Sequence, residues 1–311
     1  MTVEISVVVP VYNAAGCMSE LHRRLTATLN RLTSSSEIVL VDDGSRDGSW
    51  AAIAQLAKDD PRVRALRLSR NFGQHAAITA GLQECQGAWA VVMDCDLQDP
   101  PEDIPRLWDR AQEGVDIVLA RRRERQHSRF RRAAARLYFT LLGLFNRTVF
   151  DSAYGTFSII SRRVIDTFLR VEDGSRHYLL MLYWLGFERA AIEYDHGDRY
   201  TGESTYRLRT LIKHALDGIF FQTTVFLRWI IHAGFLLSAT GLALAAYIVY
   251  HYFRSGALEG WTSLAVLILI IGGFTIVSIG VAALYIARIF EQVKGRPLFV
   301  VSRRIAHGVE Q

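Results

Sequence analysis

The sequence predicts an α/β fold with a doubly wound, mostly parallel sheet, followed by a C-terminal part that associates with a membrane. Short apolar runs rich in β-branched residues alternate with helical patterns over the first 120 residues, which is the pattern of βαβ units. Two stretches without Asp, Glu, Lys or Arg then occupy residues 229–253 and 261–287. Each stretch exceeds the roughly 20 residues that cross a bilayer core.

The elements of the predicted sheet follow one another in strict alternation. Strands are expected at 4–10, 38–41, 63–68, 90–93 and 115–120. Helices are expected at 18–32, 50–57, 76–84 and 103–112. Polar clusters follow the strands at their C-terminal ends, where open α/β sheets bind their ligands. We therefore expect the functional site along this edge of the sheet.

The most informative cluster is the Asp-Cys-Asp sequence that directly follows the apolar run 90–93. Residues i and i+2 of an extended chain point to the same side, so the carboxylates of Asp94 and Asp96 can meet at one point. Such a pair suits Mg²⁺ or Mn²⁺, because proteins hold these ions by one or two carboxylates together with a substrate's phosphates. The alternative is an acidic turn that only stays solvated.

Composition and motifs argue against several other classes of protein. The 311-residue chain has a net charge of +5 and three widely spaced cysteines without a Cys-x-x-Cys pattern. This argues against a disulfide framework or a zinc site and fits a reducing cytoplasm. Gly-x-Gly-x-x-Gly and Walker patterns are absent, so a dinucleotide or P-loop site has little support. No signal peptide is expected, because residues 5–10 lack a basic flank.

Four motifs in order resemble the family 2 glycosyltransferases, which have the Rossmann-like GT-A fold. They are Val-Val-Val-Pro-Val-Tyr-Asn at 7–13, Val-Asp-Asp-Gly-Ser at 41–45, Arg-Asn-Phe-Gly at 70–73 and Met-Asp-Cys-Asp-Leu-Gln-Asp-Pro-Pro-Glu at 93–102. The chain is most similar to the branch that charges an undecaprenyl or dolichyl phosphate with one sugar, such as the dolichyl-phosphate mannose synthases. The resemblance implies a UDP- or GDP-sugar donor, a polyprenyl phosphate acceptor and Mg²⁺ or Mn²⁺.

The resemblance also implies roles for individual residues. Contacts to the donor nucleotide are expected from Pro10, Tyr12, Asn13, Val41, Asp42 and Asp43. The metal is expected near Asp94, Asp96 and Gln98. Phosphate and acceptor contacts are expected from Arg122, Arg131, Arg132, Arg199 and Ser204. Asp94, Asp96 and Arg122 are the candidate catalytic residues, together with Asp151 as a group that could orient the nucleophile.

Three positions depart from the family pattern. Ala14 stands where many relatives have Glu, Thr156 where they have a proposed catalytic Asp, and Thr205 where they have Lys. The resemblance therefore identifies neither the catalytic base of this chain nor the residue that neutralises the donor diphosphate. A phosphomonoester has a second pKa near 6, so its oxygen is mostly ionised at neutral pH and tolerates the loss of a base.

A basic stretch and an amphipathic stretch indicate contact with a lipid surface. Eight arginines crowd residues 121–136 with only Glu124 opposing them. A solvated helix or a nucleic-acid patch is the alternative, but the neighbouring apolar stretches favour anionic lipid headgroups and a lipid phosphate. Residues 208–220 then carry apolar side chains at helical spacing, as an interfacial helix does.

We therefore expect four regions. Residues 1–205 form a cytoplasmic GT-A domain, 206–226 an interfacial helix, 227–288 two transmembrane helices with a short outer turn, and 289–311 a basic tail. Positive charge lies before the first span and after the second, against only Arg254 in the turn. The positive-inside rule then predicts a multi-pass protein of the plasma membrane with its catalytic domain in the cytoplasm.

The sequence thus indicates an inverting, metal-dependent enzyme that moves one sugar from a nucleotide sugar to a polyprenyl phosphate. A processive glycan synthase is a rival, although the Gln-x-x-Arg-Trp motif of such enzymes is absent. A catalytically inactive scaffold that binds lipid is a second rival, which Thr156 and Thr205 leave open. The residues specify neither the sugar nor the base, they are compatible with a homo-oligomer, and no nucleic-acid partner is expected.

Overall fold

The computed structural model describes residues 3–123, 153–172, 176–195, 197, 225–255 and 261–310. The chain divides into two compact units. The first combines the described parts of Met1–Phe139, Thr148–Ser204 and Arg296–Gln311, and the second those of Thr140–Arg147 and Thr205–Gly295.

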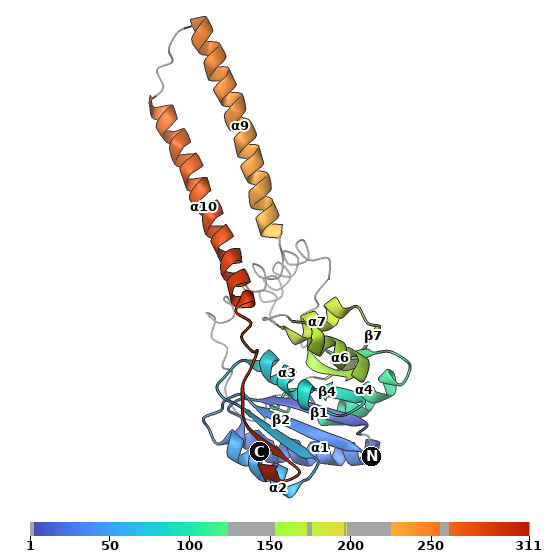
Figure 1. The fold of residues 1–311 in the computed structure, drawn as a ribbon. Coiled ribbons are helices and arrows are strands. Elements are labelled where there is room, and N and C mark those ends of the chain that lie inside the picture. Colours follow the sequence, from blue (N-terminus) through green and yellow to red (C-terminus); the bar gives the residue numbers. More distant parts are fainter. Residues whose placement is uncertain are drawn as a thin grey trace. The chain divides into compact units, whose positions relative to one another are not determined.

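The first unit is built on a sheet whose nine described strands have the order β7-β5-β6-β4-β1-β2-β3-β8-β9 (Figure 1). The strands are β1 (Ile5–Val11), β2 (Ser36–Asp42), β3 (Val63–Leu68), β4 (Trp89–Val92), β5 (Ile117–Arg122), β6 (Tyr154–Ser161), β7 (Arg189–Tyr194), β8 (Val301–Ala306) and β9 (Val309–Glu310). The helices of this unit are η1 (Ala15–Cys17), α1 (Met18–Leu32), α2 (Ser49–Asp59), α3 (Gln74–Glu84), η2 (Pro101–Asp103), α4 (Ile104–Ala111), α6 (Arg162–Arg170) and α7 (Tyr178–Leu185).

The sheet is mixed, so the predicted α/β class is confirmed but the expectation of a mostly parallel sheet holds only for the four central strands and for the edge pair of β5 and β7. Strands β4, β1, β2 and β3 are parallel neighbours, whereas β6 is antiparallel to both β4 and β5. The chain re-enters the sheet beside the C-terminal end of β5, where Arg121 pairs with Tyr154. From that end, the next strand can only run back along β5, and it is therefore antiparallel.

Both faces of the sheet are covered by helices. Helices α1, α2 and α4 pack on one face together with Val7 and Val9 of β1. Helices α3, α6 and α7 pack on the other face, which includes Val8. Successive side chains of a strand point to opposite faces, and both faces here need apolar side chains. This explains why β1 is buried along its whole length and reads as a continuous apolar run.

The C-terminal residues of the chain belong to this sheet. Strand β8 pairs antiparallel with β3, and β9 pairs with β8. From the sequence, residues 289–311 were expected only as a basic tail, and these two strands were not predicted. The pairing places residues from the end of the chain beside the loops that follow β1 and β2.

The second unit contains the long helices α9 (Val225–Ser255) and α10 (Trp261–Val293). Among the described residues, one helix, α10, contains a segment apolar and long enough to cross a membrane, at Ile270–Ala287. A second crossing by α9 therefore stays a prediction. Nearly all of the interfacial segment predicted at 206–226 lies outside the described residues.

Candidate functional site

The loops that follow β1 and β2 hold each other in place. Asn13 has a positive φ of 49°, a conformation that asparagine tolerates better than most residues. Its backbone N–H donates to Ser45 Oγ at 2.9 Å, and its side-chain Oδ1 accepts from the Arg46 N–H at 3.0 Å. Pro10 and Val41 are register partners on the two strands. Three of the residues predicted to contact a nucleotide, Pro10, Asn13 and Val41, are thus brought together.

Asp43 ties the loop after β2 to the loop after β3. Its carboxylate oxygens accept the backbone N–H groups of Phe72 at 2.7 Å and Gly73 at 2.9 Å. Asp43 is only 2% exposed, and burial raises its pKa although the two N–H groups act against that rise. The adjacent Gly44 has φ +70°, and a Cβ there would lie 2.6 Å from the Arg70 carbonyl carbon. This close approach of two backbones requires a glycine.

Asp42 is fully buried and also acts within the protein. Its Oδ1 accepts the Ser45 N–H at 3.1 Å, and its Oδ2 lies 3.2 Å from Arg67 Nε in an ion pair. Both members of the Asp-Asp pair therefore stabilise the loops around them. Direct contacts from either carboxylate to a nucleotide remain a prediction.

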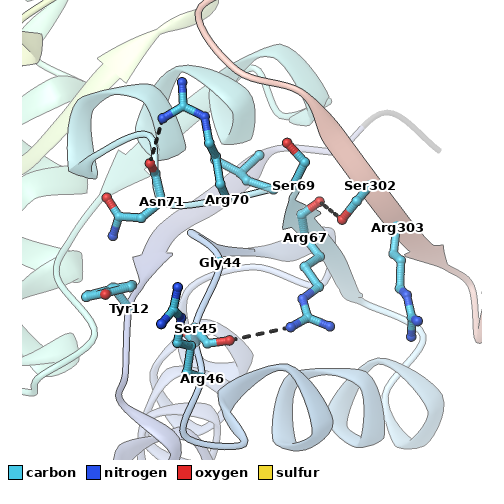
Figure 2. A pocket seen from close by; sticks show the side chains of 11 residues that line it. Tyr12, Gly44, Ser45, Arg46, Arg67, Ser69, Arg70, Asn71, Ser302 and Arg303 are labelled. Carbon is cyan, nitrogen blue, oxygen red and sulfur yellow. Dashed lines mark hydrogen bonds between the residues drawn. The ribbon is translucent and has the colours of Figure 1, made fainter.

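These loops border a pocket of about 460 Å³ (Figure 2). Tyr12, another of the residues predicted to contact a nucleotide, lies at one side of it and is 43% exposed. The remaining lining residues come from the loops after β2 and β3, from β3 itself and from β8. They are Gly44, Ser45, Arg46, Arg67, Leu68, Ser69, Arg70, Asn71, Ser302 and Arg303. Four arginines give the pocket a positive lining suited to an anionic ligand.

Asp94 and Asp96 lie directly after β4, and β1 lies between this strand and β2. Asp94 Oδ1 accepts two hydrogen bonds, from Gln74 Nε2 at 2.6 Å and from Thr156 Oγ1 at 3.0 Å. Asp96 Oδ1 accepts the Gln98 N–H at 3.2 Å, across a turn in which Leu97 has a φ of 62°. This short turn holds the second carboxylate close to the strand end.

Gln98 contacts Gly197, which lies far from it in the sequence. Its Nε2 donates to the Gly197 carbonyl at 3.3 Å, and its own carbonyl accepts the Gly197 N–H at 2.9 Å. These bonds join the Asp94–Asp96 loop to residue 197. The role of Gln98 at a metal stays a prediction.

The charges around Asp94 fit a divalent cation. Burial, followed by the neighbouring carboxylates of Asp99 and Asp96, raises the pKa of Asp94 to about 7. A cation bound between Asp94 and Asp96 would relieve this repulsion. Among the described residues, no group of three or more His, Cys, Asp or Glu side chains is arranged to bind a metal. A site of two carboxylates suits Mg²⁺ or Mn²⁺, because substrate phosphates supply further ligands.

Arg122, at the end of β5, lies close enough to Asp94 for its positive charge to lower the pKa of that carboxyl. Its Nε donates to the Tyr194 hydroxyl at 3.2 Å, and that hydroxyl donates to Asp99 Oδ1 at 2.5 Å. A Cβ at Gly155 would lie 2.8 Å from Arg122 Nη2, so this guanidinium packs against the backbone of β6. A tyrosine and a glycine thus hold the predicted phosphate-binding arginine in place.

Four residues that contribute to this site were not predicted from the sequence. Gln74 and Thr156 orient Asp94, while Tyr194 and Asp99 orient Arg122. Two of them have a signal in the sequence, because Gln74 directly follows the Arg-Asn-Phe-Gly motif and Asp99 lies within the motif at 93–102. The predicted residues Asp151, Arg131, Arg132, Arg199 and Ser204 lie outside the described residues.

Comparison with known sequences gives full-length similarities. The family "Glycosyl transferase family 2" matches residues 6–169. The chain is 34% identical over 310 residues to the glycosyltransferase YkcC of Bacillus subtilis, covering 99% of this chain and 95% of YkcC. It is 36% identical over 304 residues to the undecaprenyl-phosphate 4-deoxy-4-formamido-L-arabinose transferase of Pseudomonas fluorescens SBW25, covering 96% of this chain and 89% of that protein.

Comparison with solved structures concerns the fold. The glucosyl-3-phosphoglycerate synthase of Mycobacterium tuberculosis, solved with Mn²⁺, UDP and glucosyl-3-phosphoglycerate, matches with a TM-score of 0.50 and 17% sequence identity. The match covers 70% of this chain and 77% of that protein. The expected GT-A-like α/β fold is thereby confirmed.

Proposed function

The chain belongs to glycosyltransferase family 2, and we propose that it transfers one sugar, with inversion, from a nucleotide sugar to undecaprenyl phosphate. The observation that carries this proposal is the paired carboxylates of Asp94 and Asp96, which lie at the end of β4 close to Arg122. The name of the Pseudomonas fluorescens relative, which is 36% identical over nearly the whole chain, supports undecaprenyl phosphate as the acceptor.

The donor's nucleotide would occupy the arginine-lined pocket. This pocket and the Asp94–Asp96 loop share the end of β1, because Tyr12, directly after β1, lines the pocket and β1 pairs with β4, which the Asp94–Asp96 loop follows. A diphosphate at this end would therefore lie beside the two carboxylates. UDP in the fold relative supports a nucleoside diphosphate as the ligand.

Asp94 and Asp96 would hold Mg²⁺ or Mn²⁺, with Gln98 as a further candidate ligand. A bound ion stabilises the negative charge of the departing nucleoside diphosphate. Gln74 and Thr156 both donate to Oδ1 of Asp94, which fixes the orientation of this carboxylate. The second oxygen of Asp94 would be the one that binds the ion, and the Mn²⁺ of the fold relative supports this choice of cofactor.

Arg122 would bind the attacking phosphate of the lipid. Its planar guanidinium can donate two parallel hydrogen bonds to a phosphate. The Tyr194 hydroxyl and Gly155 restrict its position. Thr156 replaces the acidic residue of many relatives, and we propose that no protein base is needed, because the phosphate oxygen is already mostly ionised at neutral pH. That oxygen attacks the anomeric carbon in line with the departing nucleoside diphosphate.

The acceptor's long hydrocarbon chain requires a membrane, and we propose the organisation that the sequence predicts. Residues 1–205 form the cytoplasmic catalytic domain, 206–226 an interfacial helix, and 227–288 a hairpin that crosses the plasma membrane twice. The apolar segment Ile270–Ala287 of α10 supports one of these crossings. Arg131, Arg132, Arg199 and Ser204 would contact the lipid or donor phosphates.

The test is product identification with the purified full-length protein in detergent. UDP-, GDP- and dTDP-sugars are each incubated with Mn²⁺ and a short-chain polyprenyl phosphate, and the lipid fraction is analysed by mass spectrometry. The proposal expects one added sugar per lipid, with an anomeric configuration opposite to that of the donor in the NMR spectrum. Chains of several sugars, or no lipid-linked product from any donor, would contradict it.

A further inference from the structure

The pocket wall includes a strand from the far end of the chain. Ser302 and Arg303 of β8 line the pocket together with the loops after β1, β2 and β3. Ser302 Oγ donates to the Arg67 carbonyl at 3.1 Å, which fastens β8 to β3 at this point. The segment that follows the apolar helix α10 therefore completes a site whose other residues all lie before residue 72.

Arg303 lies directly opposite Arg67 on the paired strands. Figure 2 shows the two side chains next to each other and extending in the same direction from their strands. Like charges directly opposite on neighbouring strands destabilise a sheet. Arg67 is compensated by its ion pair with the buried Asp42. The repulsion between the two arginines therefore destabilises the sheet at Arg303, unless a bound ligand neutralises the charge of this residue.

The ion pair that Arg303 forms within the protein is weak. Its Nη1 lies 3.8 Å from Glu310 Oε1, and the two side chains are 55% and 53% exposed. Exposed ion pairs contribute little stability, because solvent screens them. The guanidinium can therefore leave this contact for a ligand at small cost.

The position of β8 decides which part of a donor it can reach. Strand β8 is the fourth strand from β4 in the order β4-β1-β2-β3-β8. Neighbouring strands lie about 4.8 Å apart, so the backbone of Arg303 is roughly 19 Å from the strand that carries the metal-binding carboxylates. An arginine cannot bridge that distance to a diphosphate held at Asp94 and Asp96. It can reach the opposite end of the donor, which is the nucleoside.

We propose that Arg303 is a donor-specificity residue, which contacts the nucleoside part of the nucleotide sugar. This inference rests on the proposed function. The guanidinium can donate to carbonyl oxygens of a base such as uracil or guanine, and it can stack on the plane of the ring. Donor binding thereby depends on a strand that is covalently continuous with α10.

The chain offers a matched control in Arg304. Side chains alternate along a strand, so Arg304 points away from the face that carries Arg303. It forms an ion pair with Glu84 at 3.0 Å and does not line the pocket. Arg303→Gln and Arg304→Gln remove the same charge from adjacent positions. A general electrostatic effect, or a loosening of β8, should affect both variants alike.

The experiment measures binding by titration calorimetry on the full-length protein in detergent with Mn²⁺. The ligands are UDP, GDP and inorganic pyrophosphate, and thermal unfolding without ligand checks the fold of each variant. We expect Arg303→Gln to raise the Kd of the tighter-binding nucleotide about tenfold, as the loss of a hydrogen bond from a charged donor does. The Kd of pyrophosphate should change less than twofold. Arg304→Gln should change neither Kd by more than twofold.

Four results would overturn the inference. An equal loss for nucleotide and pyrophosphate would mean that Arg303 acts on phosphates, and equal losses in the two variants would mean that only charge or strand integrity matters. Unchanged binding of the nucleotide in Arg303→Gln would remove the residue from the donor site while leaving the proposed function intact. If the wild-type protein binds neither UDP nor GDP, the inference fails together with the expected UDP- or GDP-sugar donor.

Discussion

Replacing Asp94 by asparagine should stabilise the metal-free protein while it abolishes sugar transfer. Burial and the neighbouring carboxylates raise the pKa of Asp94 from 3.8 to about 7. At 1.36 kcal/mol per pH unit, this rise corresponds to a cost of roughly 4 kcal/mol for ionised Asp94 in the folded state. Asparagine has nearly the same shape, and its side-chain oxygen can still accept from Gln74 and Thr156.

The pH dependence of this effect has a defined sign. Because the folded protein binds the proton of Asp94 more tightly than the unfolded chain, this group reduces stability as the pH rises from about 4 to about 7. The cost is complete above pH 7 and absent below about pH 4. At pH 5 it amounts to roughly a third of its full value.

The assay is thermal unfolding of both proteins in detergent with EDTA, at pH 5 and pH 8. Even half of the calculated cost, roughly 2 kcal/mol, should make the Tm of Asp94→Asn higher by roughly 4 to 8 °C at pH 8. The difference should narrow at pH 5. Mn²⁺ should raise the Tm of the wild-type protein at pH 8 but not that of the variant. A variant that is no more stable than wild type in EDTA at pH 8 would refute the electrostatic reasoning.

The remaining predictions concern the phosphate site and the membrane. Arg122→Lys should lower the transfer rate more than about tenfold, because lysine lacks the planar fork of the guanidinium. Arg123→Lys, at the exposed neighbouring position, should hardly change the rate. Equal rates in the two variants would contradict the role of Arg122. Tyr194→Phe removes the hydroxyl that accepts from the Arg122 Nε and should raise the KM for the lipid phosphate more than that for the donor, which steady-state kinetics would measure. Single cysteines at Ser255 and His307 in a cysteine-free protein should differ toward an impermeant thiol reagent on intact cells, with labelling only at 255; labelling only at 307 would reverse the topology.

The central part of the fold could be predicted because its signals are local. Strands β1, β2 and β4 are short, largely apolar runs, and β3 has Arg64 and Arg67 between its buried apolar residues. Each of the four strands is followed by a polar motif that marks the C-terminal edge of the sheet. Their parallel arrangement follows from the helices between them. Asp94 and Asp96 were found by the same logic, since a strand followed by two carboxylates is visible in a few consecutive residues.

The other features depend on contacts between distant parts of the chain. Strand β8 pairs with β3 across more than 230 residues, as the bond from Ser302 to Arg67 illustrates, and no local pattern marks which edge a C-terminal strand will join. Thr156 reaches Asp94 across 62 residues, and the hydroxyl of Tyr194 reaches Asp99 across 95. In the sequence, Thr156 was notable only because many relatives have an aspartate at this position. In the structure it is a hydrogen-bond donor that orients Asp94.

The most direct test of the account is the metal dependence of sugar transfer to a polyprenyl phosphate. Transfer of a radiolabelled sugar into the lipid fraction is measured for wild type and Asp96→Asn, first in EDTA and then with Mn²⁺ or Mg²⁺ added. We expect no transfer by wild type in EDTA, recovery with either ion, and a rate at least about a hundredfold lower in the variant, since a metal ion supplies several kcal/mol of transition-state stabilisation. Full wild-type activity in EDTA would contradict the role assigned to Asp94 and Asp96.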